Sequence, residues 1–436
     1  MHLNVATTIQ KRPINYNLEF LRGLAALIVV YHHVIEHSHL LDPGYAPKGV
    51  WSFNPPGHLS VLIFFILSGY VIGLTNPIPL RGKTILTYLK KRFWRIYPIY
   101  AVSVLFTGLI SYPNHSGLEL VQTLLFLQIA DIGDTLAENN PLWSLDMEIL
   151  FYMAFIPVSA FRINSRLLTI IAFVLPLTLI FLFTNVTVGL LIAHTTAFCF
   201  WLLGIVFSEK YMLVEPKKLN YSLLLSSVLA FASLNYFNAV LTLLNRVLAI
   251  FRPYSSLDES NWNANISLIK DFASLPLCAI VILLFVGASG KLVRYSYYAL
   301  LALNLSTFYY LFQHWHEAQI TSFAIPGLLF LFSIGLLLFQ DNSVLNQKLE
   351  SFMRWGAQLG SISYGIYVIH FPILYSFSLF PHFSGSAVSF AGRFILFMAF
   401  TLTAAFLLEK KWQPWIMNRF AATKPTSVSE AALKSV

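Results

Sequence analysis

Long apolar runs separated by short polar stretches follow one another along most of the 436 residues. A run of roughly 20 apolar residues lets a helix cross the bilayer core, so we predict an all-α membrane bundle of about 10 to 12 spans. The sequence predicts one membrane domain over 1–410 and a short, disordered cytoplasmic tail over 411–436. The predicted spans are 19–38, 59–75, 96–112, 144–161, 167–184, 188–208, 219–240, 268–288, 296–314, 323–340, 359–380 and 389–409.

Basic residues between these runs indicate which loops face the cytoplasm. Lys11 and Arg12 precede the first span, and a dense group of Lys and Arg over 81–95 follows the second. Short cytoplasmic loops are enriched in such residues, so both segments are expected inside. The later basic clusters fall on the same side only if segment 118–130 does not cross. We therefore predict a short or re-entrant element there and both termini in the cytoplasm.

Composition agrees with lipid as the main solvent. Charged residues make up 11% of the chain and hydrophobic ones 57%, whereas soluble domains carry roughly 25% charged residues. The net charge of +9 suits an anionic membrane surface, and no nucleic-acid motif accompanies it. Because Cys199 and Cys278 both lie in apolar runs, we expect neither a disulfide framework nor a metal cluster. A multi-pass protein of the cell (inner or plasma) membrane is expected.

The first predicted span carries two ionisable residues on one face. Arg22 and His33 are eleven residues apart, which returns to nearly the same helical azimuth and separates them by roughly 16 Å in depth. Ionisable groups inside a span mark functional sites, and an imidazole is a suitable base. Glu36 is a candidate to orient His33, whereas His32 points elsewhere and is expected to be structural. The alternative is a snorkelling arginine with a hydrogen-bonded structural histidine.

Further motifs accompany this helix. They contain Phe64, Phe65, Ser68, Gly69 and Tyr70, then Arg92, Arg95, Tyr97 and Pro98, then Trp143, Ser144, Leu145, Glu148, Phe151 and Tyr152, and finally Ser363, Tyr364, Tyr367 and His370. With the L-E-x-L-R-G sequence around Arg22 and its spacing to His33, they resemble the acyltransferase 3 family of integral membrane acyltransferases. The resemblance extends over residues 17–410, and Ser60 and Asp146 depart from the family pattern.

The resemblance implies an O-acyltransferase that moves an acyl group, most often acetyl, from acyl-CoA to a hydroxyl of a cell-surface or secreted glycan or glycolipid. His33 is expected to act as general base or covalent acyl carrier, and Glu148 to bind sugar hydroxyls or tune the catalytic site. No tightly bound cofactor and no metal are expected. Some relatives carry an additional domain, so a separate periplasmic or extracellular partner is a further expectation.

The remaining candidates divide between donor and acceptor. Guanidinium groups bind phosphate through paired, charge-assisted hydrogen bonds. The residues expected to bind acyl-CoA are Arg22, Arg92 and Arg95, assisted by Lys91, with Ser68 and Tyr70 lining the site. The residues expected to contact the acceptor or line the site are Trp143, Ser144, Tyr152, Tyr364, Tyr367 and His370.

Structural interpretations stay open beside the functional ones. The cations at Arg92 and Arg95 also satisfy the positive-inside rule, and Glu148 also suits an interfacial helix end. The Ser68 to Tyr70 segment also suits close helix packing, and the late tyrosines and histidine also suit structural hydrogen bonds. At the level of the whole protein, the competing functions are a transporter of acyl groups or small anions and a non-catalytic scaffold.

Overall fold

The structure is a computed structural model, which describes residues 15–127, 136–181, 186–211, 219–254, 259–288, 290–314 and 320–421. Every regular element in these ranges is helical, which confirms the all-α prediction. The main helices are α1 (Tyr16–Glu36), α3 (Gly57–Thr75), α4 (Lys83–Ile110), α6 (Trp143–Ala160), α7 (Ser165–Leu179), α8 (Val186–Tyr211), α9 (Tyr221–Tyr236), α10 (Ala239–Phe251), α11 (Glu259–Ile269), α12 (Leu275–Phe285), α13 (Lys291–Gln313), α14 (Ile320–Leu338), α15 (Ser343–Gly360), α16 (Ser363–Ser378) and α17 (Ala387–Leu407).

Shorter helices and single turns connect these elements. They are α2 (Ser38–Leu41), η1 (Gly49–Ser52), α5 (Gly117–Leu124), η3 (Ala137–Leu142), η4 (Arg252–Tyr254), η5 (Lys270–Ser274), η6 (Leu408–Trp412), α18 (Gln413–Ile416) and η7 (Met417–Ala421).

Several helices are suited to cross a membrane. Seven described helical segments are long and apolar enough, or eight if α9 and α10, bent by 53° at a short break, form one broken span. The seven include α1, α3, α4, α6, α8 and α17, together with the segment Ile266–Phe285. The exact number of spans and the side of each terminus stay predictions.

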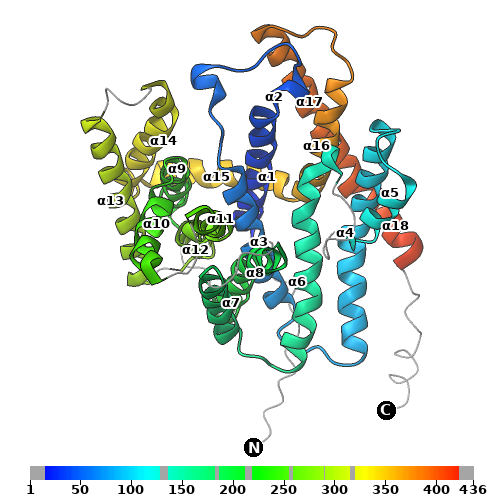
Figure 1. The fold of residues 1–436 in the computed structure, drawn as a ribbon, viewed down its shortest axis with the longest axis horizontal. Coiled ribbons are helices and arrows are strands. Elements are labelled where there is room, and N and C mark those ends of the chain that lie inside the picture. The colour runs from blue at the N-terminus through cyan, green and yellow to red at the C-terminus, as the bar shows by residue number, and fades with distance from the viewer. Residues whose placement is uncertain are drawn as a thin grey trace, which may run out of the picture.

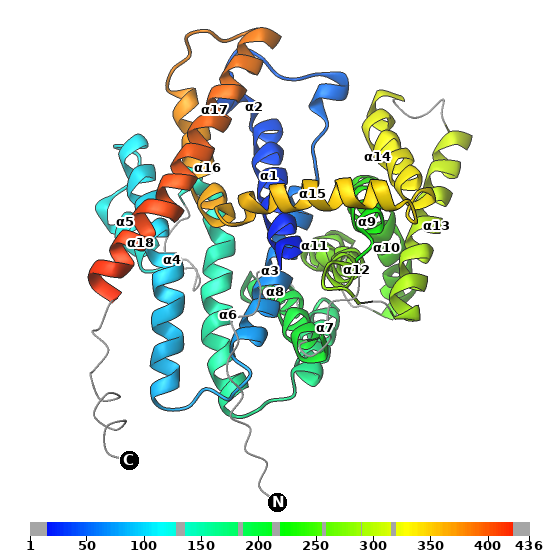
Figure 2. The ribbon, with the colours of Figure 1, turned by 180° about the vertical axis from the view of Figure 1, so that it is seen from behind.

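One predicted span in the C-terminal half is divided between two helices. The predicted span 359–380 begins inside α15 and continues into α16, because the chain turns between Gly360 and Ser363. A Cβ at Gly360 would lie 2.0 Å from the carbonyl oxygen of Glu19, so the backbones of α15 and α1 touch at this turn. Figure 2 shows α15 lying across α1 instead of alongside it. The prediction of one continuous span is therefore wrong. The amphipathic helix α15 packs across α1, and the separate helix α16, of 16 residues, follows it.

The C-terminal segment is ordered beyond the predicted domain boundary. Helical structure continues from α17 through η6 and α18 to Ala421. Gln413 is buried and its amide donates to the carbonyl oxygens of Trp94 and Arg95 at 2.9 and 2.7 Å. The prediction of a disordered tail from 411 is wrong for 411–421, because these contacts with α4 fix it, and residues 422–436 lie outside the described residues.

Segment 118–130 contains the short element that the charge distribution predicts. Ser116 and Glu119 form a reciprocal capping box at the start of α5, which has eight residues. A helix of this length spans about 12 Å, well short of the roughly 30 Å bilayer core. Residues 128–130 of the segment lie outside the described part of the chain, so its re-entrant character stays a prediction.

Helix α1 lies at the centre of the bundle, with α3, α15 and α16 in contact with it (Figure 1). Small residues allow the closest helix contact, between α3 and α8. A Cβ at Gly69 would lie 1.9 Å from the carbonyl oxygen of Trp201, and one at Gly204 would lie 2.1 Å from that of Ile66. Close approach through small residues is the usual basis of helix packing in membranes. This contact holds α3, which carries Ser68, in a fixed position relative to its neighbours.

Candidate functional site

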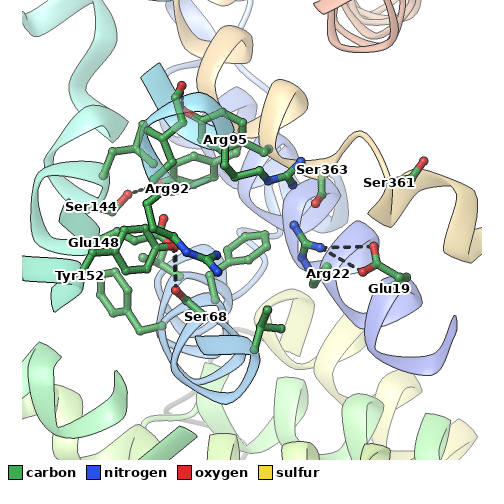
Figure 3. Close-up of a pocket in the computed structure, with 18 of the residues that line it drawn as sticks. Glu19, Arg22, Ser68, Arg92, Arg95, Ser144, Glu148, Tyr152, Ser361 and Ser363 are labelled. Carbon is green, nitrogen blue, oxygen red and sulfur yellow. Dashed lines mark hydrogen bonds and ion pairs between the residues drawn. The ribbon is translucent and has the colours of Figure 1, made fainter. Parts of the chain in front are cut away.

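A cavity of about 700 Å³ opens between α1, α3, α4, α6, α15 and α16, and we call it the arginine pocket (Figure 3). Its charged and hydroxyl-bearing lining side chains are Glu19, Arg22, Ser68, Arg92, Arg95, Ser144, Glu148, Tyr152, Arg354, Ser361, Ser363, Tyr364 and Tyr367. Its apolar lining includes Val61, Phe64, Phe65 and Val71 of α3. Residues that the sequence places in five separate motifs therefore surround one space.

Three of the four lining arginines have a carboxylate partner. Arg22 bonds Glu19 at 3.0 and 3.3 Å, one turn earlier on α1. Arg95 bonds Glu409 at 3.2 Å, and Arg354 bonds Glu350 at 2.7 Å. The hydrogen bonds between Arg354 and Glu350 raise the pKa of the arginine and lower that of the carboxyl. These pairs hold each guanidinium at the wall while part of it still faces the cavity.

Arg92 is held in a different way, by aromatic rings. Its guanidinium lies 5.6 Å from the ring centres of both Tyr88 and Tyr152, which is within the range of cation–π attraction. Its Nη2 donates a weak hydrogen bond of 3.4 Å to Thr75, and its buried Nε–H has no partner among the described residues. A buried donor without a partner costs about 1–3 kcal/mol. Among the described lining arginines, Arg92 is therefore the one that no carboxylate neutralises.

Glu148 faces the same cavity at the centre of a hydroxyl cluster. Ser68 donates to its Oε1 at 2.7 Å, and Tyr152, one turn away on α6, donates to the same oxygen. Trp201 of α8 in turn donates to Ser68 at 3.4 Å. Ser68 and Glu148 are 80 residues apart in the sequence. In the structure both side chains are in contact, so Glu148 belongs to the arginine pocket.

His33 pairs with a second histidine from α16. His33 Nδ1 lies 2.8 Å from His370 Nε2, and His370 Nδ1 lies 2.7 Å from the carbonyl oxygen of Tyr367. A carbonyl only accepts, so His370 Nδ1 carries hydrogen and, in the neutral ring, Nε2 is the acceptor. His33 Nδ1 must then donate to it. The remaining nitrogen of a neutral His33, Nε2, is left with a free lone pair.

Glu36 contacts a different histidine from the one predicted. Its Oε2 lies 3.0 Å from His32 Nε2 and 3.9 Å from His37 Nε2. His32 Nδ1 is 2.9 Å from the carbonyl oxygen of Pro55. Both i,i+3 and i,i+4 spacings bring helical side chains together, and Glu36 takes the second. The prediction that Glu36 orients His33 is therefore wrong, since His370 fills that place.

The arginine pocket extends toward the two histidines but does not include them. Its wall follows α3 from Val71 to Val61, a rise of about 15 Å. Val61 is one turn from Gly57, where a Cβ would lie 2.4 Å from the His32 ring. On α16 the lining ends at Tyr367, one turn before His370. Ser144 and Tyr367, joined by a hydrogen bond of 2.7 Å, form what we call the partition at this end of the pocket, and the ring centres of Tyr367 and His370 lie 6.0 Å apart.

A family model described as an acyltransferase domain, of the acyltransferase 3 family, matches residues 15–296. The chain belongs to the acyltransferase 3 family. The matched range carries Arg22, His33, the Ser68 motif, both α4 arginines and Glu148, and it ends before Tyr364, Tyr367 and His370. Membership places the chain among acyltransferases, and its apolar helices make it a multi-pass membrane protein.

Comparison with individual proteins adds one relative. Over 150 residues the acyltransferase is 31% identical to "Acyltransferase MdmB" of Streptomyces mycarofaciens, covering 32% of this chain and 38% of the relative. The alignment thus spans well under half of the relative's length. No solved structure matches the chain.

Besides His33, Glu36 and His370, three further predicted site residues lie away from the pocket. Lys91 is exposed, about 100° around α4 from Arg92. Tyr70 is buried two residues beyond Ser68, on the other side of α3. Trp143 stacks with the His58 ring at 6.1 Å instead of facing the cavity with Ser144. In each case a side chain near a pocket residue in sequence points elsewhere, because successive helical positions differ by about 100°.

Two residues that shape the site carry no recognisable signal of function in the sequence. Arg354 of α15 belongs to one of the later basic clusters, which indicate topology only, and Glu409 of η6 belongs to none of the motifs. Glu409 is buried, accepts from the Gly365 backbone N–H at 2.9 Å and holds Arg95. It lies in a π-helical turn, a feature that often occurs at functional sites. In the sequence it shows only as an acidic residue at the end of the last apolar run.

Proposed function

We propose that this acyltransferase takes its acyl group from a coenzyme A thioester and transfers it to a hydroxyl of a glycan or glycolipid. Acetyl is the acyl group that the family resemblance favours. In this proposal the arginine pocket holds the phosphates of the donor, and His33 is the base that activates the acceptor hydroxyl. A cell membrane is the proposed location.

The observation that carries the proposal is the state of Arg92. Its guanidinium has cation–π partners and an unpartnered buried N–H, in a cavity that three further arginines line. Among the described residues no ion pair neutralises it, in contrast to Arg22, Arg95 and Arg354. Phosphate oxygens are the ligands that a guanidinium binds most specifically. Coenzyme A carries several phosphates at one end, which suits this arrangement.

The shape of the pocket supports a long, thin donor. From Arg92 the cavity follows α3 toward Val61, and the apolar side chains of Phe64, Phe65 and Val71 line that route. The pantetheine arm of coenzyme A has this form, with the thioester at its far end. With phosphates at Arg92, the thioester would approach the partition of Ser144 and Tyr367, one helical turn from the histidine pair.

The chemistry assigned to His33 follows from its tautomer. The acceptor hydroxyl oxygen attacks the thioester carbonyl carbon, and His33 Nε2 takes the hydroxyl proton as the new C–O bond forms. The C–S bond then breaks, and the coenzyme A thiolate leaves and is protonated. In the covalent route, Nε2 attacks the thioester first and the hydroxyl attacks the acyl-imidazole. Both routes need the same free lone pair.

An acyl-transfer assay tests this proposal. Membranes containing the wild type, His33→Ala or His39→Ala at equal expression are supplied with labelled acetyl-CoA, and label in the glycan fraction is measured. His39 is an exposed neighbour outside the proposed machinery and serves as the matched control. We expect transfer in the wild type and the control and none above background in His33→Ala. Equal transfer in all three would remove His33 from the reaction.

A further inference from the structure

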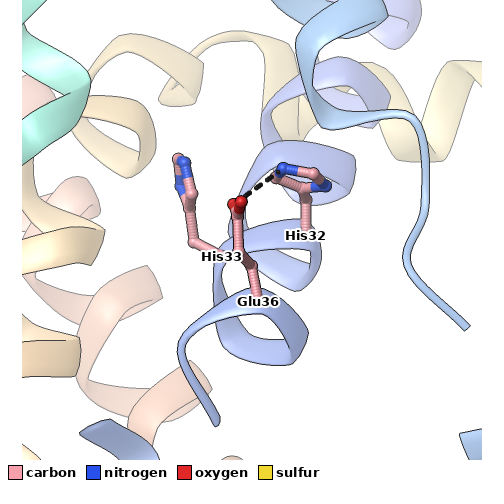
Figure 4. A group of neighbouring side chains, drawn as sticks. All are labelled: His32, His33 and Glu36. Carbon is pink, nitrogen blue, oxygen red and sulfur yellow. Dashed lines mark ion pairs between the residues drawn. The ribbon is translucent and has the colours of Figure 1, made fainter. Parts of the chain in front are cut away.

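A group of metal-binding side chains lies at the end of α1, outside the arginine pocket. One ring nitrogen each of His32 and His33 and one carboxylate oxygen of Glu36 all lie within 4.8 Å of one another. Figure 4 shows the Glu36 carboxylate between the two imidazole rings. The position of the two cysteines predicts no metal cluster, but this compact His-His-x-x-Glu arrangement contains no cysteine.

Hydrogen bonding of Nδ1 leaves Nε2 free to bind a metal ion on both rings. His32 Nδ1 faces the Pro55 carbonyl oxygen at 2.9 Å and must donate to it, and His33 Nδ1 donates to His370. Metal-bound histidines nearly always donate their other ring N–H to such an acceptor, which fixes the tautomer. The two Nε2 lone pairs are thereby available as ligands.

The contact between His32 and Glu36 calls for a positive charge. In a neutral His32 the Nε2 lone pair faces the Glu36 carboxylate oxygen at 3.0 Å, and two acceptors at that distance repel. A proton on Nε2 would relieve this repulsion, and so would a metal ion bound to both atoms. With bonds of about 2.0–2.1 Å to each ligand, a tetrahedral metal separates its ligand atoms by a little over 3 Å.

We propose that His32, His33 and Glu36 form a binding site for a divalent transition-metal ion of the zinc class. Two imidazoles and one carboxylate are a zinc ligand set that leaves one position open, and this set favours zinc over magnesium. The C-terminal end of a helix, where these residues lie, attracts cations. The Glu36 side chain is 49% exposed and that of His32 is 21% exposed, which gives an ion access from solvent.

His37 stands beside the site as a further nitrogen ligand. Its Nε2 lies 3.9 Å from Glu36 Oε2, and its ring centre is 6.1 Å from that of His33. A small movement of this side chain would complete a four-coordinate site.

The metal site has a consequence that rests on the proposed function. A metal ion bound to His33 Nε2 occupies the lone pair that the transfer reaction requires. Zinc is therefore expected to inhibit acyl transfer, and a chelator to restore it. A device of this kind would make the enzyme sensitive to zinc on the side of the membrane where α1 ends.

Direct binding of Zn²⁺ to the purified full-length protein in detergent tests the site. The wild type, His32→Ala, Glu36→Gln and the control His194→Ala are freed of metal and titrated calorimetrically, with Mg²⁺ as a second probe. His194, half-buried on α8 with Nδ1 on a backbone carbonyl, controls for general histidine binding. Because even partner groups outside the ligand shell change affinity by about 10–100-fold, each ligand substitution should weaken Zn²⁺ binding by at least about tenfold.

The outcomes separate the two proposals. One strong Zn²⁺ site in the wild type and control, weakened in both ligand variants and absent for Mg²⁺, supports the metal site. Equal Zn²⁺ binding in all four proteins, or no binding, overturns it. Glu36→Gln preserves side-chain shape and keeps the test valid if His32→Ala does not fold. If Zn²⁺ binds as expected but does not inhibit transfer, the site stands and the role of His33 as base is refuted.

Discussion

Neutralising Arg92 should weaken coenzyme A binding more than removing any other single charge from the same segment. In Arg92→Gln the side chain loses its charge and its paired N–H donors, while the cation–π contacts with Tyr88 and Tyr152 also disappear. A hydrogen bond to a charged group contributes about 1.5–3 kcal/mol. At about 1.4 kcal/mol per tenfold change, the Kd for coenzyme A should rise roughly 10- to 150-fold.

Calorimetric titration of the detergent-solubilised protein with coenzyme A measures this change. Lys90→Gln is the matched control, because Lys90 is an exposed cation two positions away and does not line the pocket. Both variants remove one positive charge from the same segment, so an effect on membrane topology would appear in both. A Kd in Arg92→Gln equal to that in Lys90→Gln would refute the phosphate assignment.

Three further results are expected. His370→Phe removes the acceptor that fixes the tautomer of His33, so kcat should fall about 10- to 100-fold while the Kd for coenzyme A stays constant. His370→Gln keeps an acceptor and should have a higher kcat than His370→Phe. Equal kcat values in the two variants would show that His370 has only a packing role. Gly69→Ala places a Cβ 1.9 Å from a backbone oxygen of α8 and should destabilise the protein by about 1–3 kcal/mol in thermal unfolding. Gly392→Ala, where the Cβ meets open space, should leave the melting temperature unchanged. Equal melting temperatures of the two variants would contradict the close contact between α3 and α8. Burial lowers the pKa of His115, but the hydrogen bonds that its ring donates to Glu138 and Glu119 outweigh burial and raise the pKa. The stability that His115 contributes is therefore complete below about pH 6.5 and is lost as the pH rises through its folded value. The melting-temperature advantage of the wild type over His115→Gln should shrink over that range, and an advantage that grows with pH would contradict this assignment.

Helical periodicity identified the residues that share a face but not their partners across the bundle. Arg92 and Arg95 lie three positions apart, and the structure places both in the arginine pocket as the spacing predicts. Nothing in the local sequence pairs Ser68 with Glu148, 80 residues away, or His33 with His370, 337 residues away. Such contacts depend on how helices pack, which a single sequence does not specify.

Near neighbours along one helix were misassigned for a different reason. Glu36 follows His32 by four residues and His33 by three, and both spacings allow contact. The Pro55 carbonyl on one ring and His370 on the other decide between them, and both lie on other segments. Likewise, α15 has a polar face and few apolar residues. Apolar runs therefore assign only its last two residues to the late span, and the helix that supplies Arg354 is not predicted.

A structure with a non-reactive acetyl-CoA analogue bound would show whether the arginine pocket and the histidine pair act on one donor molecule. We expect the phosphates in contact with Arg92 and the pantetheine arm along α3. We expect the carbonyl carbon of the analogue close enough to His33 Nε2 for one acceptor hydroxyl to reach both. If the carbonyl stayed on the Arg92 side of the Ser144–Tyr367 partition, with His33 in its present position and out of reach, the pocket and the histidine pair would not act on the same donor.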